Sequence, residues 1–457
     1  MVNIIGNNFA SLYLAYLCHT NSISATIYTD GMRLGGHFSG VIERDHILDL
    51  GMVCIEKLQP RNTEKELERQ IIYNEPLNCV ESVRKINCHI DKLFNPNPTH
   101  PPLTFYENKF YPDFFITDRL DILDAVCDKT LKLGVDSNIL HPKNKHTLSW
   151  KNSPSYEDAS NYNHGATLHN SVIKPFLRKM TTIEATELSS KYHRALWLPL
   201  YWRETIKTKF NQDKCDLEPY QFYRSKNGSV ASVVRNIELN IRKSQHVKVD
   251  DTKIKKAKVE KKILKIQTVH QSSFVEANSI GLSTKRLFNF LSIPFQEFHD
   301  FASISIAFVE INSNLIKSFT APFVHVVDEN IPIYRISISA SQTKRAKTIL
   351  TLEMTSASRH TVKIGNEKNE IRYYLSKIFS CAEKDFEVFR CFEIKNAIAL
   401  PTQSNLQHHE KNTMTLLDQI DKKGLTGNLV KFDGNNLNEQ IFQANTIFEI
   451  ITNQVRT

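Results

Sequence analysis

The stretch VNIIGNNFASLYLAYL, residues 2–17, decides the fold of this protein. It opens with a short apolar run that ends at Gly6, and residues 9–17 have the composition of a helix. The chain therefore passes from a strand through a tight turn into a helix. Such a turn points backbone N–H groups and the positive end of the helix dipole at one place, where an anion can bind.

The turn carries a weakened form of a known glycine pattern. Glycines at G-x-G-x-x-G spacing permit the turn, the approach of a pyrophosphate and close helix packing in the first βα unit of a Rossmann-type domain. Here the three positions hold Gly6, Asn8 and Ser11. Asn tolerates left-handed backbone better than most residues and Ser is small, so we expect a weaker site that is not abolished. An ordinary βα turn without a ligand explains this motif equally well when it is taken alone.

The second predicted strand, residues 25–29, bears on the ribose contact. In a Rossmann-type domain this strand ends in an acidic residue that binds the ribose hydroxyls. Here the strand ends in Thr29, and Asp30 follows one place later. We therefore expect Thr29 and Asp30 to lie at the cofactor, with that hydrogen bond in doubt.

The next segment, DGMRLGGHFSG (residues 30–40), is followed by a predicted short hairpin within residues 41–51. A turn with Arg33 and then Gly35 and Gly36 resembles the entrance to the FAD site in the flavin amine oxidase superfamily, which includes protoporphyrinogen oxidases and UDP-galactopyranose mutases. The resemblance implies that the double glycine lets the backbone approach the flavin, as only residues without a side chain allow.

The resemblance continues in degenerate form along nearly the whole chain. Residues 219–284 have the order of a glycine turn, helix, strand, hairpin and strand, which in this superfamily returns the chain to the FAD domain; the strand at Ile254 would lie against the adenine. Residues 424–451 contain a predicted turn and a helix whose apolar positions share a face. By resemblance, the N-terminus of that helix meets the pyrimidine edge of the flavin through Asn435, Asn436 and Leu437.

These patterns predict an α/β protein: a Rossmann-like FAD-binding domain with a discontinuous α+β substrate domain. The expected FAD-binding domain comprises residues 1–75, 205–292 and 392–457. The expected substrate domain comprises residues 76–204 and 293–391, with a helical part and an antiparallel sheet predicted from the alternation within residues 301–353. Polar residues 137–166 are predicted to form a long surface loop.

Composition limits the classes of function. The chain has 457 residues, a net charge of +9 and 41% hydrophobic residues, which is ordinary for a large globular protein. Much of the positive charge lies in residues 252–267, which we interpret as exposed hairpin strands and not as a nucleic-acid surface. The eight cysteines form no CxxC pair, so we expect free thiols, no metal site and a cytoplasmic protein. No stretch is apolar enough for integral membrane insertion. We expect a small-molecule substrate and leave a homodimer open.

Candidate catalytic residues are His37, Arg203 and Trp202. His37 follows the double glycine and would lie close to the flavin, although a buried hydrogen-bonded histidine is an equal alternative. Trp202 and Arg203 belong to an amphipathic stretch that could line the substrate cavity; the alternative is that the aromatic side chains are core and Arg203 forms a surface ion pair.

Three functions remain open at this point. The resemblance implies foremost an oxidoreductase with noncovalent FAD that removes hydride from a small or medium-sized substrate. The second is a non-redox nucleotide-sugar mutase for surface polysaccharide, in which Arg178, Arg203 and Arg224 are available to hold a diphosphate. The third is a flavin-free descendant that acts as a binding or scaffold protein, which the replacements at the glycine and ribose positions suggest.

Overall fold

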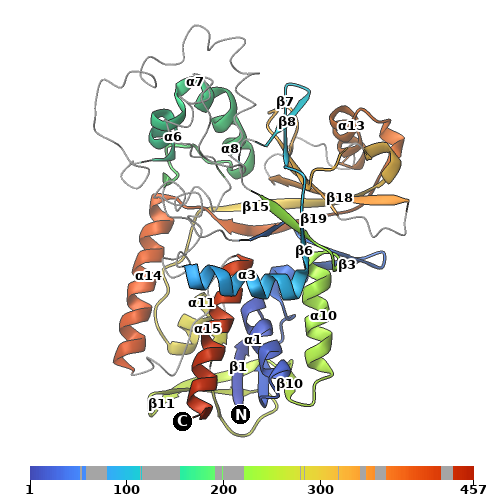
Figure 1. Ribbon diagram of the computed structural model, residues 1–457. Helices are drawn as coiled ribbons and strands as arrows, with labels where there is room; N and C mark the ends of the chain where they lie inside the picture. Colours follow the sequence, from blue (N-terminus) through green and yellow to red (C-terminus); the bar gives the residue numbers. More distant parts are fainter. Residues whose placement is uncertain are drawn as a thin grey trace.

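The computed structural model describes most of the chain in two stacked layers (Figure 1). The described residues are 1–51, 54–57, 80–113, 115, 155–190, 198, 221–277, 279–281, 284–317, 319–339, 346–355, 367–423 and 436–456. One layer contains a parallel sheet with the N-terminus, and the other contains a large, largely antiparallel sheet. The predicted α/β class is confirmed.

The parallel sheet has the strand order β10-β2-β1-β14. All neighbouring strands in it run parallel, with Ile4 paired to both Ile27 and Ser279. Strand β1 is buried along its whole length, because helices cover one face and a small sheet covers the other. The strands are β1 (Val2–Gly6), β2 (Ala25–Tyr28), β10 (Val247–Asp250) and β14 (Ser279–Gly281).

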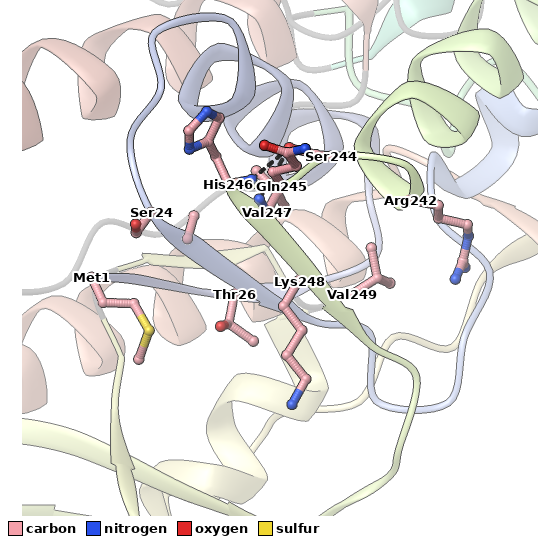
Figure 2. A pocket seen from close by; sticks show the side chains of 11 residues that line it. Met1, Ser24, Thr26, Arg242, Ser244, Gln245, His246, Val247, Lys248 and Val249 are labelled. Atoms are coloured by element: carbon pink, nitrogen blue, oxygen red, sulfur yellow. Dashed lines mark hydrogen bonds between the residues drawn. The ribbon is translucent and has the colours of Figure 1, made fainter.

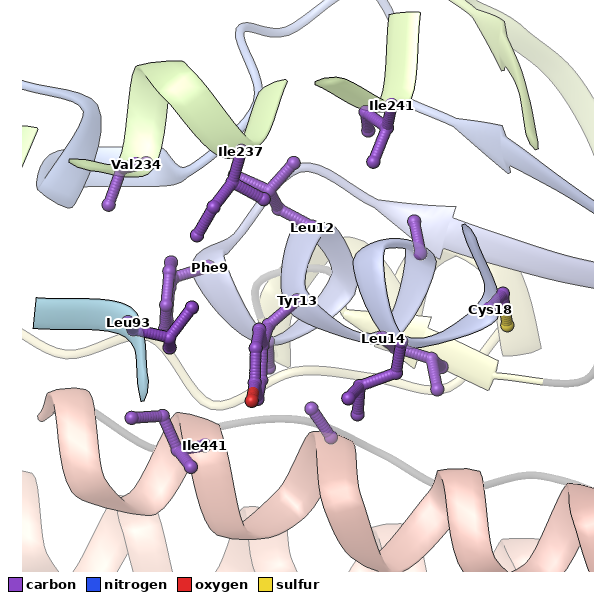
Figure 3. Close-up of a cluster of buried hydrophobic side chains, with 14 of the residues drawn as sticks. Phe9, Leu12, Tyr13, Leu14, Cys18, Leu93, Val234, Ile237, Ile241 and Ile441 are labelled. Carbon is purple, nitrogen blue, oxygen red and sulfur yellow. The ribbon is translucent and has the colours of Figure 1, made fainter. Parts of the chain in front are cut away.

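Helices from distant parts of the chain cover one face of this sheet. They are α1 (Phe9–Thr20), α3 (Val80–Phe94), α10 (Val230–Arg242) and α15 (Leu437–Arg456). Helix α1 lies among the other three, with Phe9 and Tyr13 directed toward α15 (Figure 3). The predicted apolar face of α15 is confirmed, since Ile441 and Ile447 are buried in this core. Helix α3 packs into the same core, although the sequence placed its residues in the second expected domain, residues 76–204.

The other face is covered by the small sheet β11-β12-β13 and helix α11. These elements are β11 (Ile254–Glu260), β12 (Ile263–Thr268), β13 (Val275–Glu276) and α11 (Thr284–Leu291). The side chains of Ile5, Tyr28 and Ile280 pack against them from the parallel sheet. Lys256 and Lys258 are exposed on β11, which confirms the predicted hairpin with a solvated basic face.

The second layer is a seven-stranded sheet in the order β19-β15-β18-β17-β16-β7-β8. Strands β7 and β8 form a hairpin whose turn residues, Glu107 and Asn108, both adopt positive φ. Strand β19 pairs with β15 along its length and so continues past the expected domain boundary at residue 392. The strands are β7 (Leu103–Tyr106), β8 (Lys109–Pro112), β15 (Phe301–Asn312), β16 (Phe323–Val326), β17 (Ile333–Ile338), β18 (Lys347–Thr355) and β19 (Phe386–Ala399).

Helices α6 (Tyr156–His164), α7 (Ala166–Leu168) and α8 (Lys174–Thr181) cover one end of this sheet (Figure 1). The prediction of a loop over residues 137–166 is wrong for residues 156–164. Ser155 caps helix α6 by accepting the Asp158 N–H at 3.1 Å, so a polar sequence still forms a helix. Lys179 on α8 donates to backbone carbonyls of Asp328, Ile331 and Ile333 at 3.0–3.1 Å and thereby ties the helices to the sheet.

The remaining elements complete the described chain. The strands are the hairpin β3 (Val41–Glu43) and β4 (His46–Leu48) and the small sheet of β5 (Ile55–Glu56), β9 (Phe222–Ser225) and β6 (Pro96–Pro98). The helices are α13 (Glu367–Phe379) and α14 (Gln403–Lys422). The single turns are the 3₁₀ turns η1 (Gly36–Ser39), η5 (Ser313–Ile316) and η6 (Glu383–Asp385) and the π-helical turn η3 (His169–Ile173), which lies between α7 and α8.

Candidate functional site

The N-terminus of α1 is capped by the residue at the second glycine position. Asn8 has φ −69° and ψ 171°, and its Oδ1 accepts the Ser11 N–H at 2.9 Å. The backbone of Asn8 is therefore extended, so its tolerance of left-handed backbone is not used. The side chain instead serves as the N-cap of the helix, a role that Asn fills as well as Asp or Ser.

The N-terminus of α15 meets that of α1. Asn436 caps α15, since its Oδ1 accepts the Glu439 N–H at 2.9 Å. Gln440, in the same first turn, reaches across to α1, where its Oε1 accepts the Ala10 N–H at 3.0 Å. Two helix N-termini, each carrying partial positive charge, thus lie side by side, an arrangement that favours an anion between them.

The double glycine packs against this junction. Gly35 has φ +90° and a bridge to Asn8, and a Cβ on it would lie 2.5 Å from Val234 Cγ1. Gly36 has φ +57°, and a Cβ there would meet only the Cα of Asn8, at 3.5 Å. Gly35 is therefore required by the fold itself, whereas Gly36 leaves room on its open side.

Arg33 and His37 flank the glycines. Arg33 is exposed overall, and its guanidinium donates to the Gly40 carbonyl oxygen at 3.3 Å. The His37 ring lies 3.9 Å from the Phe38 ring. Partial desolvation by neighbouring atoms lowers the pKa of His37, although the residue as a whole is exposed. The alternative of a buried, hydrogen-bonded histidine is therefore not what the structure shows.

At the end of β2, where the ribose of the cofactor was expected, the carboxylates already have hydrogen-bond partners within the protein. Thr29 is buried, and its hydroxyl donates to Asp251 Oδ1 at 3.2 Å. The Asp30 carboxylate accepts the Ile254 N–H at 2.8 Å and the Nε–H of Arg286 at 2.9 Å. The side chain of Ile254 packs in the core beneath. The structure therefore brings the predicted residues together, but it gives them contacts within the protein.

Sequence analysis missed Asp251, the carboxylate beside Thr29. It follows β10, the edge strand parallel to β2, and pairs with Arg242 at 2.8 Å. The Arg242 guanidinium lowers the pKa of Asp251. Acidic residues at the carboxyl ends of adjacent parallel strands meet at one edge of a sheet, and this rule could have identified Asp251.

Two buried polar atoms at the junction of α1 and α15 have no hydrogen-bond partner within the described ranges of the chain. They are Asn436 Nδ2 and Ser11 Oγ. Both can donate, and buried donors are almost always paired. Together with the room at Gly36, they fit a cofactor with an anionic diphosphate, so the described residues are compatible with FAD.

Of the remaining predicted residues, the two arginines that the structure describes, Arg178 and Arg224, do not converge on this junction. Trp202, Arg203 and Asn435 lie outside the described residues. Arg178 is exposed and pairs with Glu184 at 2.7 Å. Arg224 donates to the carbonyl oxygens of Pro322 and Ile338 beside the antiparallel sheet. The available arginines therefore do not form one diphosphate clamp in the part that can be described.

A buried charged group lies where the two layers meet, and sequence analysis did not find it. Glu353 is 2% exposed and accepts a hydrogen bond from Arg335 Nε at 2.7 Å and another from the Tyr334 hydroxyl at 3.2 Å. Gly51 follows the β3-β4 hairpin, and a Cβ on it would lie 3.3 Å from Glu353 Oε1. Burial and the Glu353 carboxylate raise the pKa of Tyr334 well above its usual value.

An open cavity of about 610 Å³ lies elsewhere, beside the amino ends of β2 and the edge strand β10 (Figure 2). Thr26 and Lys248 line it together with Met1. The helix N-termini described above lie at the carboxyl ends of the strands, where ligands of open parallel sheets bind. We therefore do not assign this cavity to the cofactor.

Three further properties concern the described residues alone. No group of three His, Cys, Asp or Glu side chains among them is placed to hold a metal ion. None of their helices combines the length and apolar character needed to cross a membrane. Their five cysteines are free thiols, as predicted: Cys18, Cys54, Cys88, Cys381 and Cys391.

Comparison with known proteins finds similarity in structure. No protein-family model and no curated protein sequence matches the chain. Reduced UDP-galactopyranose mutase superposes with a TM-score of 0.66 at 12% identity, covering 100% of this chain and 95% of that one. A protoporphyrinogen oxidase-like protein from Exiguobacterium sp. 255-15 gives 0.59 at 14% identity, covering 99% and 98%.

Putrescine oxidase bound to putrescine gives a TM-score of 0.60 at 12% identity, again covering 99% of this chain and 98% of that one. The comparisons therefore show the same fold across both layers. The resemblance to the flavin amine oxidase superfamily is confirmed at the level of the fold, including its mixed α/β architecture.

Proposed function

From a fold shared over its whole length with a galactopyranose mutase and an amine oxidase, we propose that this protein is a flavoenzyme. The specific function that we propose is an oxidoreductase with noncovalent FAD, which oxidises a small or medium-sized substrate by hydride transfer. The observation that carries the proposal is the meeting of the α1 and α15 N-termini beside the double glycine. Two helix dipoles and an unpaired amide donor favour an anionic group there.

The residues that would hold FAD come from three segments. Asn8 and Ser11 present the first turn of α1, Gly35 and Gly36 supply backbone without side chains, and Asn436 supplies the unpaired amide donor. We keep Gly6, Thr29, Asp30, Arg33, Ile254, Asn435 and Leu437 as proposed cofactor residues. When bound, FAD supplies the hydride acceptor, and the protein positions the substrate and excludes water.

The substrate side of the proposed site is the antiparallel sheet. Glu353 and Arg335 lie on adjacent strands of that sheet, and the Glu353 carboxylate lies beside Gly51, which follows the β3-β4 hairpin. In a substrate cavity, a pre-formed ion pair such as that of Glu353 and Arg335 would fix the orientation of a polar substrate group. His37, Trp202 and Arg203 remain the proposed active-site residues. A cytoplasmic location, the absence of nucleic acid as a partner and the oligomeric state remain predictions.

A nucleotide-sugar mutase is the second candidate, because UDP-galactopyranose mutase superposes with a TM-score of 0.66. In that case, activity would require reduced flavin without net oxidation of the substrate, so assays with and without a reductant separate the two flavoenzymes.

The test of the proposed function is the visible absorption spectrum of the purified protein, before and after incubation with FAD and removal of free FAD. We expect a flavin spectrum at close to one FAD per chain. A protein that stays colourless after incubation would overturn both flavoenzyme functions and leave the flavin-free scaffold.

A further inference from the structure

The first turn of α1 has few N–H groups left for an anion. Asn8 Oδ1 accepts the N–H of Ser11, and Gln440 Oε1 accepts that of Ala10. The Phe9 N–H is the one amide of this turn that has no acceptor among the described residues. An anion at this helix therefore has to compete for its donors with the protein's own side chains.

The two competing side chains differ in where they come from. Asn8 belongs to the turn itself, so its cap moves with α1. Gln440 lies 430 positions further along the chain, on α15, and is 3% exposed. Its own backbone N–H donates to the Asn436 carbonyl oxygen at 3.2 Å, which fixes it in the first turn of α15. The contact with Ala10 therefore joins two helices as well as occupying a donor.

We propose, as an extension of the FAD-binding function above, that Gln440 sets the affinity for the cofactor by competing with its diphosphate for the Ala10 N–H. A neutral amide oxygen accepts a hydrogen bond less strongly than an ionised phosphate oxygen does. The diphosphate therefore displaces Gln440, and the buried contact that is lost weakens cofactor binding. One hydrogen bond of ordinary strength corresponds to roughly a fivefold to tenfold change in Kd.

A purely structural role for Gln440 and a competition with the diphosphate predict opposite changes in FAD affinity when the side chain is replaced. If the side chain only ties α15 to α1, its removal loosens the junction, and FAD binding becomes weaker or stays the same. If it competes with the diphosphate, its removal makes FAD binding tighter, while the protein without added FAD becomes less stable. The two roles are therefore separated by the sign of the change in affinity.

The experiment is a titration of each purified variant with FAD, followed by quenching of flavin fluorescence, with the thermal unfolding midpoint measured without added FAD. Gln440→Met keeps the side-chain volume and removes the acceptor. Gln440→Glu keeps the acceptor and places a negative charge beside the diphosphate. The matched control is Gln443→Met on the same helix, because Gln443 Oε1 has no hydrogen-bond partner in the described part of the chain.

We expect Gln440→Met to bind FAD roughly fivefold to tenfold more tightly than the unmodified protein and to unfold at a lower temperature. We expect Gln440→Glu to bind FAD at least tenfold more weakly, and Gln443→Met to leave the Kd within about twofold. If Gln440→Met does not fold, Gln440→Ala, which also removes the acceptor, is titrated in its place, and tighter binding of FAD is again the expected result.

Equal or weaker binding by Gln440→Met, or an unchanged Kd in Gln440→Glu, would overturn the competition while the proposed FAD binding stands. No binding of FAD by any of the proteins would overturn the proposed function, and the competition with it. The two failures are therefore distinguishable in one set of titrations.

Discussion

Substitution of Gly35 by alanine tests whether the double glycine is required by the fold. Gly35 has φ +90°, and the new Cβ would lie 2.5 Å from Val234 Cγ1 and 3.2 Å from Ser39 Cβ. The left-handed backbone costs an alanine about 1–2 kcal/mol, and overpacking in a buried site costs about 1–3 kcal/mol. We therefore expect Gly35→Ala to lower the free energy of unfolding by about 2–5 kcal/mol.

The matched control is Gly36→Ala, because its Cβ would make only an ordinary contact at 3.5 Å. We expect Gly36→Ala to lower the free energy of unfolding by about 1 kcal/mol, because only the left-handed backbone conformation is unfavourable for alanine there. The free energies are compared by urea unfolding followed by circular dichroism, with Gly35→Ala also placed on a Val234→Ala background that removes the overlapping methyl group.

Relief of the overlap makes the double variant Gly35→Ala/Val234→Ala more stable than the sum of its single changes, by about 1–3 kcal/mol. Equal losses for Gly35→Ala and Gly36→Ala, or strictly additive changes in the double variant, would refute the assignment of Gly35 to packing against α10.

Three further changes follow from buried polar groups. Burial raises the pKa of Asp49 from 3.8 to about 6, so the folded state binds this proton more tightly than the unfolded state and stability falls as the pH rises between these values. Asp49→Asn keeps an acceptor for the Ala231 N–H and should remove this loss in the free energy of unfolding, which is up to about 3 kcal/mol. The measurement compares the urea unfolding midpoints of both proteins at pH 4 and pH 7. The same change between the two pH values in both proteins would contradict the role given to Asp49. Lys179→Met leaves several buried carbonyls without a donor and should lower the thermal unfolding midpoint by the equivalent of about 3 kcal/mol. Lys179→Arg keeps the charge and should lower the midpoint less. Equal decreases in the midpoint would contradict the role given to the Lys179 hydrogen bonds. Glu353→Gln leaves the Arg335 guanidinium without its carboxylate and should lower the free energy of unfolding in urea by about 3 kcal/mol. The double variant Glu353→Gln/Arg335→Met should recover part of this loss. A loss in the double variant equal to the sum of the two single losses would contradict the pairing.

Local elements in both layers could be predicted because neighbouring residues determine them. The strand ending at Gly6, the β3-β4 hairpin and the apolar face of α15 each depend on residues within a few positions. Helix α6 was missed because its polar composition resembles a loop, although Ser155 followed by Asp158 is a helix-start pattern.

The contacts that decide the chemistry of the site could not be predicted in the same way. Gln440 meets Ala10 across 430 positions, and nothing local to either residue indicates the pair. The same holds for Asp30 and Arg286, which form an ion pair between β2 and α11. Such pairs depend on how helices dock on the sheet, and a single sequence does not specify this.

The position of α15 has a consequence for the order in which the protein matures during synthesis. Phe9, Tyr13 and Leu14 are translated early, yet part of the surface that buries them belongs to residues 437–456. Until the ribosome has released that helix, the apolar side of α1 stays exposed and is a target for chaperones. The layer that contains α1 therefore becomes native only after α15 has been synthesised, and removal of α15 would send the chain toward aggregation or degradation.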